Sequence, residues 1–565
     1  MQLFHPRKTN YDYLEPRARE LMKKTIEFFE NKGKKKLKDD DHNAVWYDDF
    51  LQFVKESQAF AILMTPKGYG ADGSHWNSSS IVAFNEIVAF YGLAYWYTWQ
   101  VSMLGIVPIF MSQNEDAKQR AAKYLQEGHI FAFGLSERAH GADLIASEMT
   151  LFKSNGGYKA SGRKYYIGNG NKAKMVSTFA KVDGTRDYAF VVVDSSHENY
   201  KLIKNVIRSQ SYVAEYELQD YPISENDVLY SGRAAWDASL STVAVCKYNL
   251  GWASIGICTH SFYEALNHAA NRRIFNKQVT DFPHIQQLFV DAYCRLLAMR
   301  LFSMRAKDYM RTASADDRRY LLFNPMVKMK VTMQGEDVIN HLWDVIAARG
   351  FEKDMYFEMA ARDIRALPKL EGTAHVNMVL VVKFINGLLF NHSEDVAKVP
   401  VIDDDRNDDF MLDQGATTKG LDKVQFQSYE KLLGSKSNIP NIRTFLEQVA
   451  ILKSFFEKEA PAKEQSKDLD FMLTLGEIFT LVPYAMLVVE EAEHTGLNDA
   501  VLDMIFNVLV RDFSKYAVEL HGKTSTSEGQ QSLCLNMIKK PSRNGNFETT
   551  WQEVMAHKDS YVMND

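Results

Sequence analysis

Two neighbouring segments combine small, hydroxyl and aromatic residues in a pattern suited to holding a flat ring system. They are Phe131-Ala-Phe-Gly-Leu-Ser-Glu-Arg-Ala-His-Gly-Ala-Asp143 and Ser161-Gly-Arg-Lys-Tyr-Tyr-Ile-Gly-Asn169. Gly134 and Gly141 permit close approach of a backbone or ligand, and Ser136 places a hydroxyl at the end of a predicted strand. Tyr165 and Tyr166 offer flat faces for stacking. A polar turn and a β-hairpin with core aromatics would give the same pattern.

A third segment, Leu370-Glu371-Gly372-Thr373, offers a carboxylate. A positioned, poorly solvated carboxylate can remove a weakly acidic proton. An ion pair between Glu371 and Lys369, or a nearby arginine, would account for the same residue.

The order of predicted elements is helix, sheet, helix, helix. Helical spacing covers residues 13–30 and 117–125, and short β-rich runs follow at 158–167, 175–180 and 188–193. Helical segments return at 243–275, 285–311 and 325–349, as in a bundle. We therefore predict a mainly helical α+β fold in four domains: an N-terminal helical domain (1–128), a middle β-domain (129–233), a helical bundle (234–400) and a C-terminal helical extension (401–565).

Three stretches need a specific interpretation. The lysine run at residues 32–38 is followed by Asp39, Asp40 and Asp41, and we interpret it as a solvated loop, with an anion-binding patch as the alternative. The uncharged stretch 91–111 is long enough to span a bilayer, but Gly105 and Pro108 favour two buried helices broken between them. The acidic stretch 403–409 is interpreted as a linker.

The composition excludes several classes of protein. A net charge of -6 gives no global basic field for nucleic acid. The 4 cysteines are far apart and lack metal-ligand spacing, which argues against a disulfide scaffold and a zinc site, and we predict no metal. The N-terminus has no apolar targeting segment, so we expect a cytoplasmic protein.

The first two segments resemble the flavin-binding middle domain of the acyl-CoA dehydrogenase family. Its pattern LTEPxAGSD is matched by Leu135, Ser136, Glu137, Gly141 and Asp143, and its strand pattern GxKxxITN by Gly162, Lys164, Ile167 and Asn169. Later family blocks follow in order: RxxF at Arg272–Phe275, GF…E…RD at Gly350, Phe351, Glu358, Arg362 and Asp363, and YEGT at Leu370–Thr373. The resemblance covers residues 10–395.

This resemblance implies an FAD-dependent dehydrogenase that forms the trans-2-enoyl-CoA from a fatty acyl-CoA. Glu371 would take the α-proton while the β-hydride moves to flavin N5, and the backbone N–H of Glu371 would hold the thioester oxygen. Some members place the base at the position of Cys246, where a cysteine cannot serve. By the resemblance, the cofactor-binding residues are Phe133, Leu135, Ser136, Tyr166, Gly168, Arg272, Phe275, Asp344, Ala348, Thr373 and His375, and the substrate-binding residues are Ala142, Lys247 and Gly372. For Lys247 a snorkelling helix lysine, and for His375 a capping or core hydrogen bond, remain alternatives.

The sequence departs from the family pattern at several of these positions. The Trp-Ile-Thr/Ser triplet that faces the flavin is Tyr166-Ile167-Gly168, so the hydroxyl expected near N5 is missing, and Ser136 could partly compensate. Ala142 replaces the serine of AGSD. The QxxGG block reads Asp344-Val-Ile-Ala-Ala348, which puts a carboxylate and two methyl groups beside the neighbouring FAD unless the aspartate points to a ribose hydroxyl or to Arg349.

The extension after residue 400 resembles the extra helical domain of the very-long-chain type, which implies a homodimer. Residues 442–456 and 473–489 are apolar enough to pack on a bundle, and membrane-surface binding through this domain is the alternative. An electron-transfer flavoprotein is the expected electron acceptor, although an acyl-CoA oxidase would differ mainly in oxygen access. A DNA-associated member, or one that binds acyl-CoA without turnover, remain the alternative functions.

Overall fold

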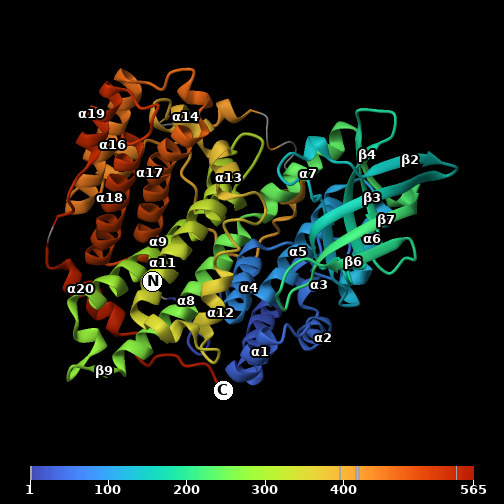
Figure 1. Cartoon of the computed structure of the whole chain (residues 1–565), viewed down its shortest axis with the longest axis horizontal. Helices are drawn as coiled ribbons and strands as arrows, with labels where there is room; N and C mark the ends of the chain where they lie inside the picture. Colours follow the sequence, from blue (N-terminus) through green and yellow to red (C-terminus); the bar gives the residue numbers. More distant parts are fainter. Residues whose placement is uncertain (1–2, 394–395, 414–416, 418–419, 543) are drawn as a thin grey trace. The chain divides into compact units, whose positions relative to one another are not determined.

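The N-terminal part of the chain is helical. The structure is a computed structural model and describes residues 3–565 except 394–395, 414–416, 418–419 and 543. The first helices are α1 Pro16–His42, α2 Asp48–Ser57, α3 Ala59–Met64, α4 Ser78–Tyr91, α5 Leu93–Met111 and α6 Glu115–Gln126 (Figure 1).

The lysine run lies in the second half of α1, so the solvated-loop interpretation is wrong. Helix α1 kinks at Gly33 (φ 74°) and then continues to His42. The side chain of Lys32 is only 4% exposed, and its ammonium lies 2.8 Å from Asp40 and 2.5 Å from Asp49. Because these two carboxylates neutralise the ammonium, Lys32 is buried in a helix rather than solvated in a loop.

The uncharged stretch does form buried helices, but the break is at Gly92 rather than between Gly105 and Pro108. Gly92 separates α4 from α5, whereas Gly105 and Pro108 both lie inside α5. A Cβ at Gly105 would lie 2.6 Å from the backbone N and O of Ala132. Gly105 is therefore required by the close contact between α5 and strand β1 (Phe131–Gly134).

The large sheet contains all three β-rich runs identified in the sequence. Its order is β6-β7-β3-β2-β4-β5-β8, and β1 pairs with β4 in parallel. Alternate side chains of β3, β4, β5 and β7 fill one core together with Val101 of α5. The elements are β1 Phe131–Gly134, η1 Leu144–Ala146, β2 Thr150–Ser154, β3 Gly157–Gly168, β4 Met175–Val182, β5 Tyr188–Val193, β6 Tyr200–Asn205, β7 Val213–Ser224, η2 Glu225–Asp227 and β8 Val228–Ser231.

Helices return after the sheet, and the predicted segment 243–275 is interrupted twice. The first interruption lies between α7 Arg233–Cys246 and α8 Asn249–Ala270, and the second is the hairpin β9 Arg273–Ile274 and β10 Lys277–Gln278. The elements that follow are η3 Val279–Asp281, α9 Pro283–Arg311, α10 Tyr320–Met326, η4 Val327–Val331, α11 Thr332–Ile346, η5 Ala347–Phe351, α12 Tyr356–Asp363, α13 Ala374–Val381, η6 Val382–Phe384 and α14 Ile385–Leu389. Segment η4 is a π-helix.

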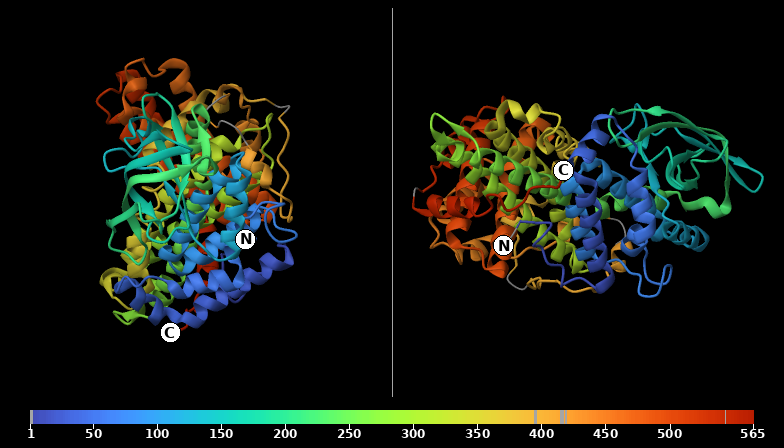
Figure 2. Two further views of the ribbon diagram at one scale, coloured as in Figure 1. Left: turned by 90° about the vertical axis from the view of Figure 1, so that its right-hand side faces the viewer. Right: turned by 90° about the horizontal axis from the view of Figure 1, so that it is seen from below.

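The C-terminal extension is helical. Its elements are η7 Asp409–Asp413, η8 Leu421–Lys423, α15 Tyr429–Gly434, α16 Pro440–Lys458, η9 Gln465–Lys467, α17 Leu469–Thr495, α18 Asp499–His521, α19 Glu528–Met537 and α20 Asn546–Met555. Helices α17 and α18 contact α9, and Figure 2 shows the orange-to-red helices beside the yellow-green ones. Among the described helices α17 alone is long and apolar enough to cross a membrane, but 83% of its most apolar window is buried within the structure, as in a core helix.

The acidic stretch after Ile402 is docked on the N-terminal helices, so it is not a free linker. Asp408 accepts a hydrogen bond from the Ser78 N–H (2.7 Å), and Asp409 accepts one from the Trp76 N–H (2.8 Å). Both donors lie at the start of α4, where unsatisfied N–H groups and the helix dipole favour carboxylates. The negative charges of this stretch therefore stabilise a helix end.

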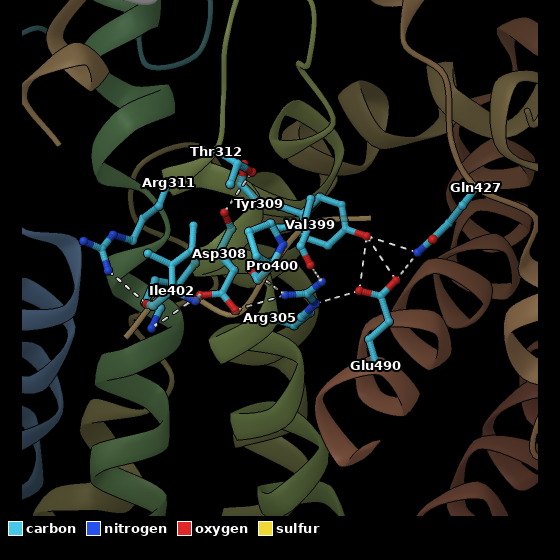
Figure 3. Close-up of polar contacts among 11 residues, drawn as sticks. Arg305, Asp308, Tyr309, Arg311, Thr312, Val399, Pro400, Ile402, Gln427 and Glu490 are labelled. Carbon is cyan, nitrogen blue, oxygen red and sulfur yellow. Dashed lines mark hydrogen bonds and ion pairs between the residues drawn. The ribbon is translucent and has the colours of Figure 1, made fainter. Parts of the chain in front are cut away.

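A buried polar cluster connects α9, the segment before the acidic stretch, and α17 (Figure 3). Arg305 donates to Glu490 (2.6 Å) and to the carbonyl of Val399, and the Tyr309 hydroxyl lies 3.0 Å from Glu490. Gln427 also donates to Glu490. Because each charge has several partners, the cluster fixes one alignment of the bundle and the extension.

The chain forms two compact units. Unit 1 consists of Met1–Arg7, Leu250–Ile402 and Gly420–Val562, and unit 2 of Lys8–Asn249, Asp403–Lys419 and Met563–Asp565. Most of the bundle and of the extension thus share unit 1. The N-terminal helices and the β-domain share unit 2 with α7 and with the acidic stretch. The fold is mainly helical with a small β-domain, which confirms the predicted fold class.

Candidate functional site

Glu371 lies in a left-handed turn of unit 1, between α12 and α13. Its φ is 52° and that of Gly372 is 79°, and the side chain of Glu371 is half-buried. A residue with a Cβ costs about 1–2 kcal/mol in this conformation, so surrounding contacts must hold it. The turn ends at Thr373, whose side chain accepts from the Val376 N–H and caps α13.

Two buried side chains bind the carbonyl groups of this turn. Lys328 donates to the carbonyl oxygens of Pro368 (2.7 Å) and Gly372 (2.5 Å). Asn377 donates to the carbonyl oxygens of Gly372 (3.1 Å) and Thr373 (3.0 Å). Lys328 and Asn377 are both missing from the sequence prediction, because neither belongs to a motif that marks it as a partner of the turn.

The neighbouring charged residues have their own contacts. The ammonium of Lys369 forms an ion pair with Glu336 of α11, the carboxylate that Arg365 also faces at 3.7 Å. Lys369 thus pairs with Glu336 rather than with Glu371. His375 is exposed on the first turn of α13.

The predicted Arg272 and Phe275 directly follow the C-terminal end of α8. The ring of Phe275 is 88% exposed, and Phe275 (φ 49°) and Asn276 (φ 62°) form the tight turn of the hairpin. Helix α8 has 22 residues, about 30 Å in length, and its other end lies against the segment that holds Lys328. Arg272 and Glu371 of one copy are therefore too far apart to contact the same small group.

The predicted Asp344 and Ala348 lie close to that hairpin. Arg349 connects the two regions, because its guanidinium lies 3.4 Å from Nδ1 of His268 on α8 and donates to Glu352. Burial lowers the pKa of His268, and the charges of Arg349 and Arg272 lower it further. Asp344 is exposed, and no ion-pair partner for it is recorded among the described residues.

Ala347 adopts a backbone conformation that favours glycine. Its φ is 57° and its ψ is -136° at the end of α11. The methyl group at this position therefore strains the turn by about 1–3 kcal/mol. This agrees with the family pattern, in which the corresponding residue is glycine.

In unit 2 the two β-domain segments bind each other directly. The Ser136 hydroxyl donates to the carbonyl of Tyr165 (2.8 Å), and the Tyr165 N–H donates to the carbonyl of Ser136 (3.0 Å). The proton of the Ser136 hydroxyl is thus committed to Tyr165, which weakens the expectation that Ser136 replaces the missing hydroxyl at position 168.

A buried ion pair also joins the same two segments. Lys164 is fully buried, and its ammonium lies 2.8 Å from Glu137 and 3.0 Å from the carbonyl of Leu135. Burial alone would raise the pKa of Glu137, but Lys164 and the backbone N–H groups of Glu148 and Met149 hold it below its ordinary value. The motif residues Glu137 and Lys164 therefore support the loop as an ionised pair.

Tyr166 and Gly168 occupy very different surroundings on β3. Tyr166 has φ 67° and its side chain is 43% exposed, so its ring is available for stacking. A Cβ at Gly168 would lie 2.8 Å from ring and methyl carbons of Tyr97 and Val101 and 2.9 Å from the Tyr97 hydroxyl. The space for a threonine side chain is thus filled by the phenol of Tyr97, a residue that the sequence prediction missed.

The remaining predicted residues of unit 2 are spread over three elements. Phe133 stacks on Phe190 of β5, with ring centroids 5.8 Å apart. Ala142 is exposed in the loop after β1, and Lys247 is buried at the end of α7.

The comparisons with known proteins agree with this arrangement. Residues 236–385 match the family model "Acyl-CoA dehydrogenase, C-terminal domain". The chain is 23% identical over 370 residues to a 3-(aryl)acrylate reductase of Clostridium sporogenes, which covers 64% of this chain and 97% of the relative. It is 22% identical over 350 residues to an acyl-CoA dehydrogenase of Bacillus subtilis, with 60% and 91% covered. Residues 236–385 therefore carry the C-terminal domain of the acyl-CoA dehydrogenase family.

A solved structure extends the likeness to the whole chain. The acyl-CoA dehydrogenase of Bacillus anthracis, solved with FAD, has 16% identity and a TM-score of 0.72, and the alignment covers 98% of this chain and 96% of that one. Butyryl-CoA dehydrogenase of Megasphaera elsdenii has a TM-score of 0.60 at 18% identity and covers 66% of this chain and 98% of that one. The fold of the extension is therefore shared with the first acyl-CoA dehydrogenase.

The residues of the chain fit a flavin dinucleotide. Such a cofactor needs cationic or N–H donors for its diphosphate and open aromatic faces for its rings. Arg272 is exposed beside His268, whose Nε2 is buried without a hydrogen-bond partner among the described residues. Phe275 and Tyr166 supply open rings. Asp344 is the exception, since an exposed carboxylate opposes a diphosphate.

Proposed function

We propose that this protein is an FAD-dependent acyl-CoA dehydrogenase in which Glu371 removes the α-proton of an acyl thioester. The observation that carries this proposal is the Glu371 turn itself. Its two left-handed residues are held by buried donors, and a half-buried carboxylate held in this way is what removal of a weakly acidic proton needs. The bound flavin would supply the acceptor for the hydride from the β-carbon.

Other residues of the chain would bind the flavin and the substrate. Phe133, Leu135, Ser136, Tyr166, Gly168, Thr373 and His375 would hold the flavin, with Arg272, Phe275, Asp344 and Ala348. Ala142, Lys247 and Gly372 would contact the substrate. Because Arg272 and Glu371 lie at opposite ends of α8, a homodimer in which Arg272 serves the partner's cofactor accounts for both.

The names of two relatives suggest the direction of the reaction and the redox partner. The 3-(aryl)acrylate reductase and a caffeyl-CoA reductase–Etf complex subunit of Acetobacterium woodii (22% identical over 343 residues) are named for reduction of a double bond. Glu371 could return the proton to the α-carbon in that direction by microscopic reversibility. We therefore propose exchange of two electrons across the Cα–Cβ bond of an acyl thioester, with an electron-transfer flavoprotein as redox partner.

The test is the visible spectrum of the purified protein, recorded without oxygen before and after addition of a long-chain acyl-CoA. We expect flavin bands that bleach with the substrate in the wild type and persist in Glu371→Gln. Glu336→Gln is the matched control, because Glu336 is a nearby carboxylate that pairs with Lys369 and lies outside the turn. Bleaching in the control but not in Glu371→Gln would support the proposal.

The second candidate function is binding of acyl-CoA without turnover. It is favoured by the exposed Asp344 and the strained Ala347, which occupy positions where the family has an amide and a glycine. A colourless protein that retains acyl-CoA and cannot be reconstituted with FAD would overturn the dehydrogenase proposal in favour of this one.

A further inference from the structure

Lys328 is a fully buried lysine whose ammonium is bound by main-chain carbonyl groups of the Glu371 turn. Its exposed fraction is 0%, and its Nζ bonds the carbonyl oxygens of Pro368 and Gly372, on either side of Glu371. A buried ammonium is costly unless its donors are satisfied. Two of its three N–H donors go to this turn, so the lysine and the turn depend on each other.

The segment that carries Lys328 is an irregular part of the helix. It is the π-helix Val327–Val331, which follows Pro325 of α10. Proline lacks the N–H that an α-helix would use, and π segments are frequent at functional sites. A Cβ at Gly251 would lie 2.5 Å from a methyl carbon of Val327, so α8 packs without a gap against the start of the π segment.

The contacts of Lys328 act on the backbone that orients Glu371. The Gly372 carbonyl accepts from both Lys328 and Asn377, which fixes the peptide plane between Gly372 and Thr373, one residue after Glu371. The Pro368 carbonyl fixes the chain three residues before Glu371. With both sides held from one ammonium, the left-handed conformation of Glu371 persists despite its intrinsic cost.

We propose that Lys328 is a positioning residue that sets the direction of the Glu371 carboxylate by holding the turn from Pro368 to Gly372. The proposal rests on the proposed role of Glu371 as the base. Lys328 itself need not contact the substrate. Its removal would take one of two donors from each carbonyl group, because Pro368 keeps the Ala374 N–H and Gly372 keeps the Asn377 amide, and the turn would relax away from the left-handed conformation.

The matched control is Lys330, two residues along the same π segment. It is equally buried (1% exposed), but its ammonium lies 3.0 Å from Glu477 of α17 and 4.9 Å from the ring centroid of Tyr516, away from the turn. Lys328→Met and Lys330→Met both remove a buried ammonium from one helical segment. A merely structural role would therefore affect both variants alike.

The experiment uses the full-length, flavin-loaded protein and two readouts. In Lys328→Met we expect kcat to fall by about a hundredfold with little change in KM, because a small misplacement of a reacting group costs about this factor. The isotope effect with α-deuterated acyl-CoA should rise, since proton removal becomes slower. Independently of turnover, amide hydrogen exchange at residues 369–374 should accelerate in Lys328→Met but not in Lys330→Met.

Each outcome has a distinct meaning. Equal losses of kcat and equal amide exchange in the two variants, or an unchanged kcat in a folded Lys328→Met protein, would overturn the proposal. If the wild type itself shows no reaction with acyl-CoA, the proposed function fails. In that case amide exchange still decides whether Lys328 holds the turn.

Discussion

Replacement of Arg295 by methionine should destabilise the contact between the bundle and the extension by about 3–5 kcal/mol, the usual cost of breaking a buried ion pair from one side. Arg295 of α9 donates two hydrogen bonds of 2.7 Å each to Asp512 of α18, and a third of 2.6 Å to Gln334 of α11. Arg295 is 9% exposed and Asp512 is 6% exposed. Without the guanidinium, Asp512 keeps a buried charge with no other hydrogen-bond partner recorded among the described residues.

The double variant Arg295→Met/Asp512→Leu separates the charge from the packing. Because an apolar pair of similar volume is often neutral relative to a buried ion pair, we expect it to recover at least about 2 kcal/mol relative to Arg295→Met alone. Lys453→Met is a control in the same unit. Its ion pair with Glu430 is partly exposed (27% and 49%), so its loss should cost less than about 1 kcal/mol.

The assay is urea unfolding of the flavin-loaded protein at one protein concentration, followed by circular dichroism and tryptophan fluorescence. Coincident transitions by the two probes are needed before free energies are compared. A double variant that is as unstable as the sum of the two single variants would refute the reasoning, because the cost would then come from lost packing rather than from an unpaired carboxylate.

Three further predictions follow from local geometry. Ala347→Gly should raise the free energy of unfolding by about 1 kcal/mol in thermal denaturation, since glycine relieves the φ of 57°, whereas a loss of stability would contradict the strain. Gly168→Thr should lower it by about 1–3 kcal/mol through overlap with the Tyr97 phenol, and Tyr97→Ala in the same chain should restore part of the loss. Burial would raise the pKa of Asp512 but Arg295 holds it below the ordinary value, so its contribution is complete above about pH 4 and is lost as the pH falls through the lowered folded pKa. Acid unfolding of Asp512→Asn should therefore depend less steeply on pH in that range.

The regular elements could be predicted wherever one periodic pattern was sufficient. The β-rich runs became β3, β4 and β5, and residues 285–311 became α9. The failures came from residues whose partners lie elsewhere. Lys32 can be buried on α1 because its ammonium pairs with Asp49, and Gly105 allows the contact with Ala132 rather than ending a helix.

The candidate site shows the same division. The motif around Glu371 singles out the residue, but not the left-handed conformation in which it is held. Gly372 lies 44 residues from Lys328 in the chain, and Tyr97 on α5 contacts Gly168 on β3. No spacing rule in one sequence connects such pairs, because their contacts exist only after α8, α10 and the sheet have packed.

The docked acidic stretch affects how this chain can be related to shorter proteins of the same fold that lack the extension. The chain passes between its two units at residues 7, 249, 402, 419 and 562. A deletion from residue 403 onward would remove both the carboxylates at the start of α4 and the helices that neutralise Arg295 and Arg305. A short descendant would thus inherit two buried arginines with part of their counter-charge lost, since only Asp308 would remain beside Arg305 and Asp337 beside Arg295. Helix α4 would keep only its Asn77 cap. Gain or loss of the extension therefore requires coordinated substitutions in the bundle and the N-terminal helices, and a single truncation event would leave a protein that folds poorly.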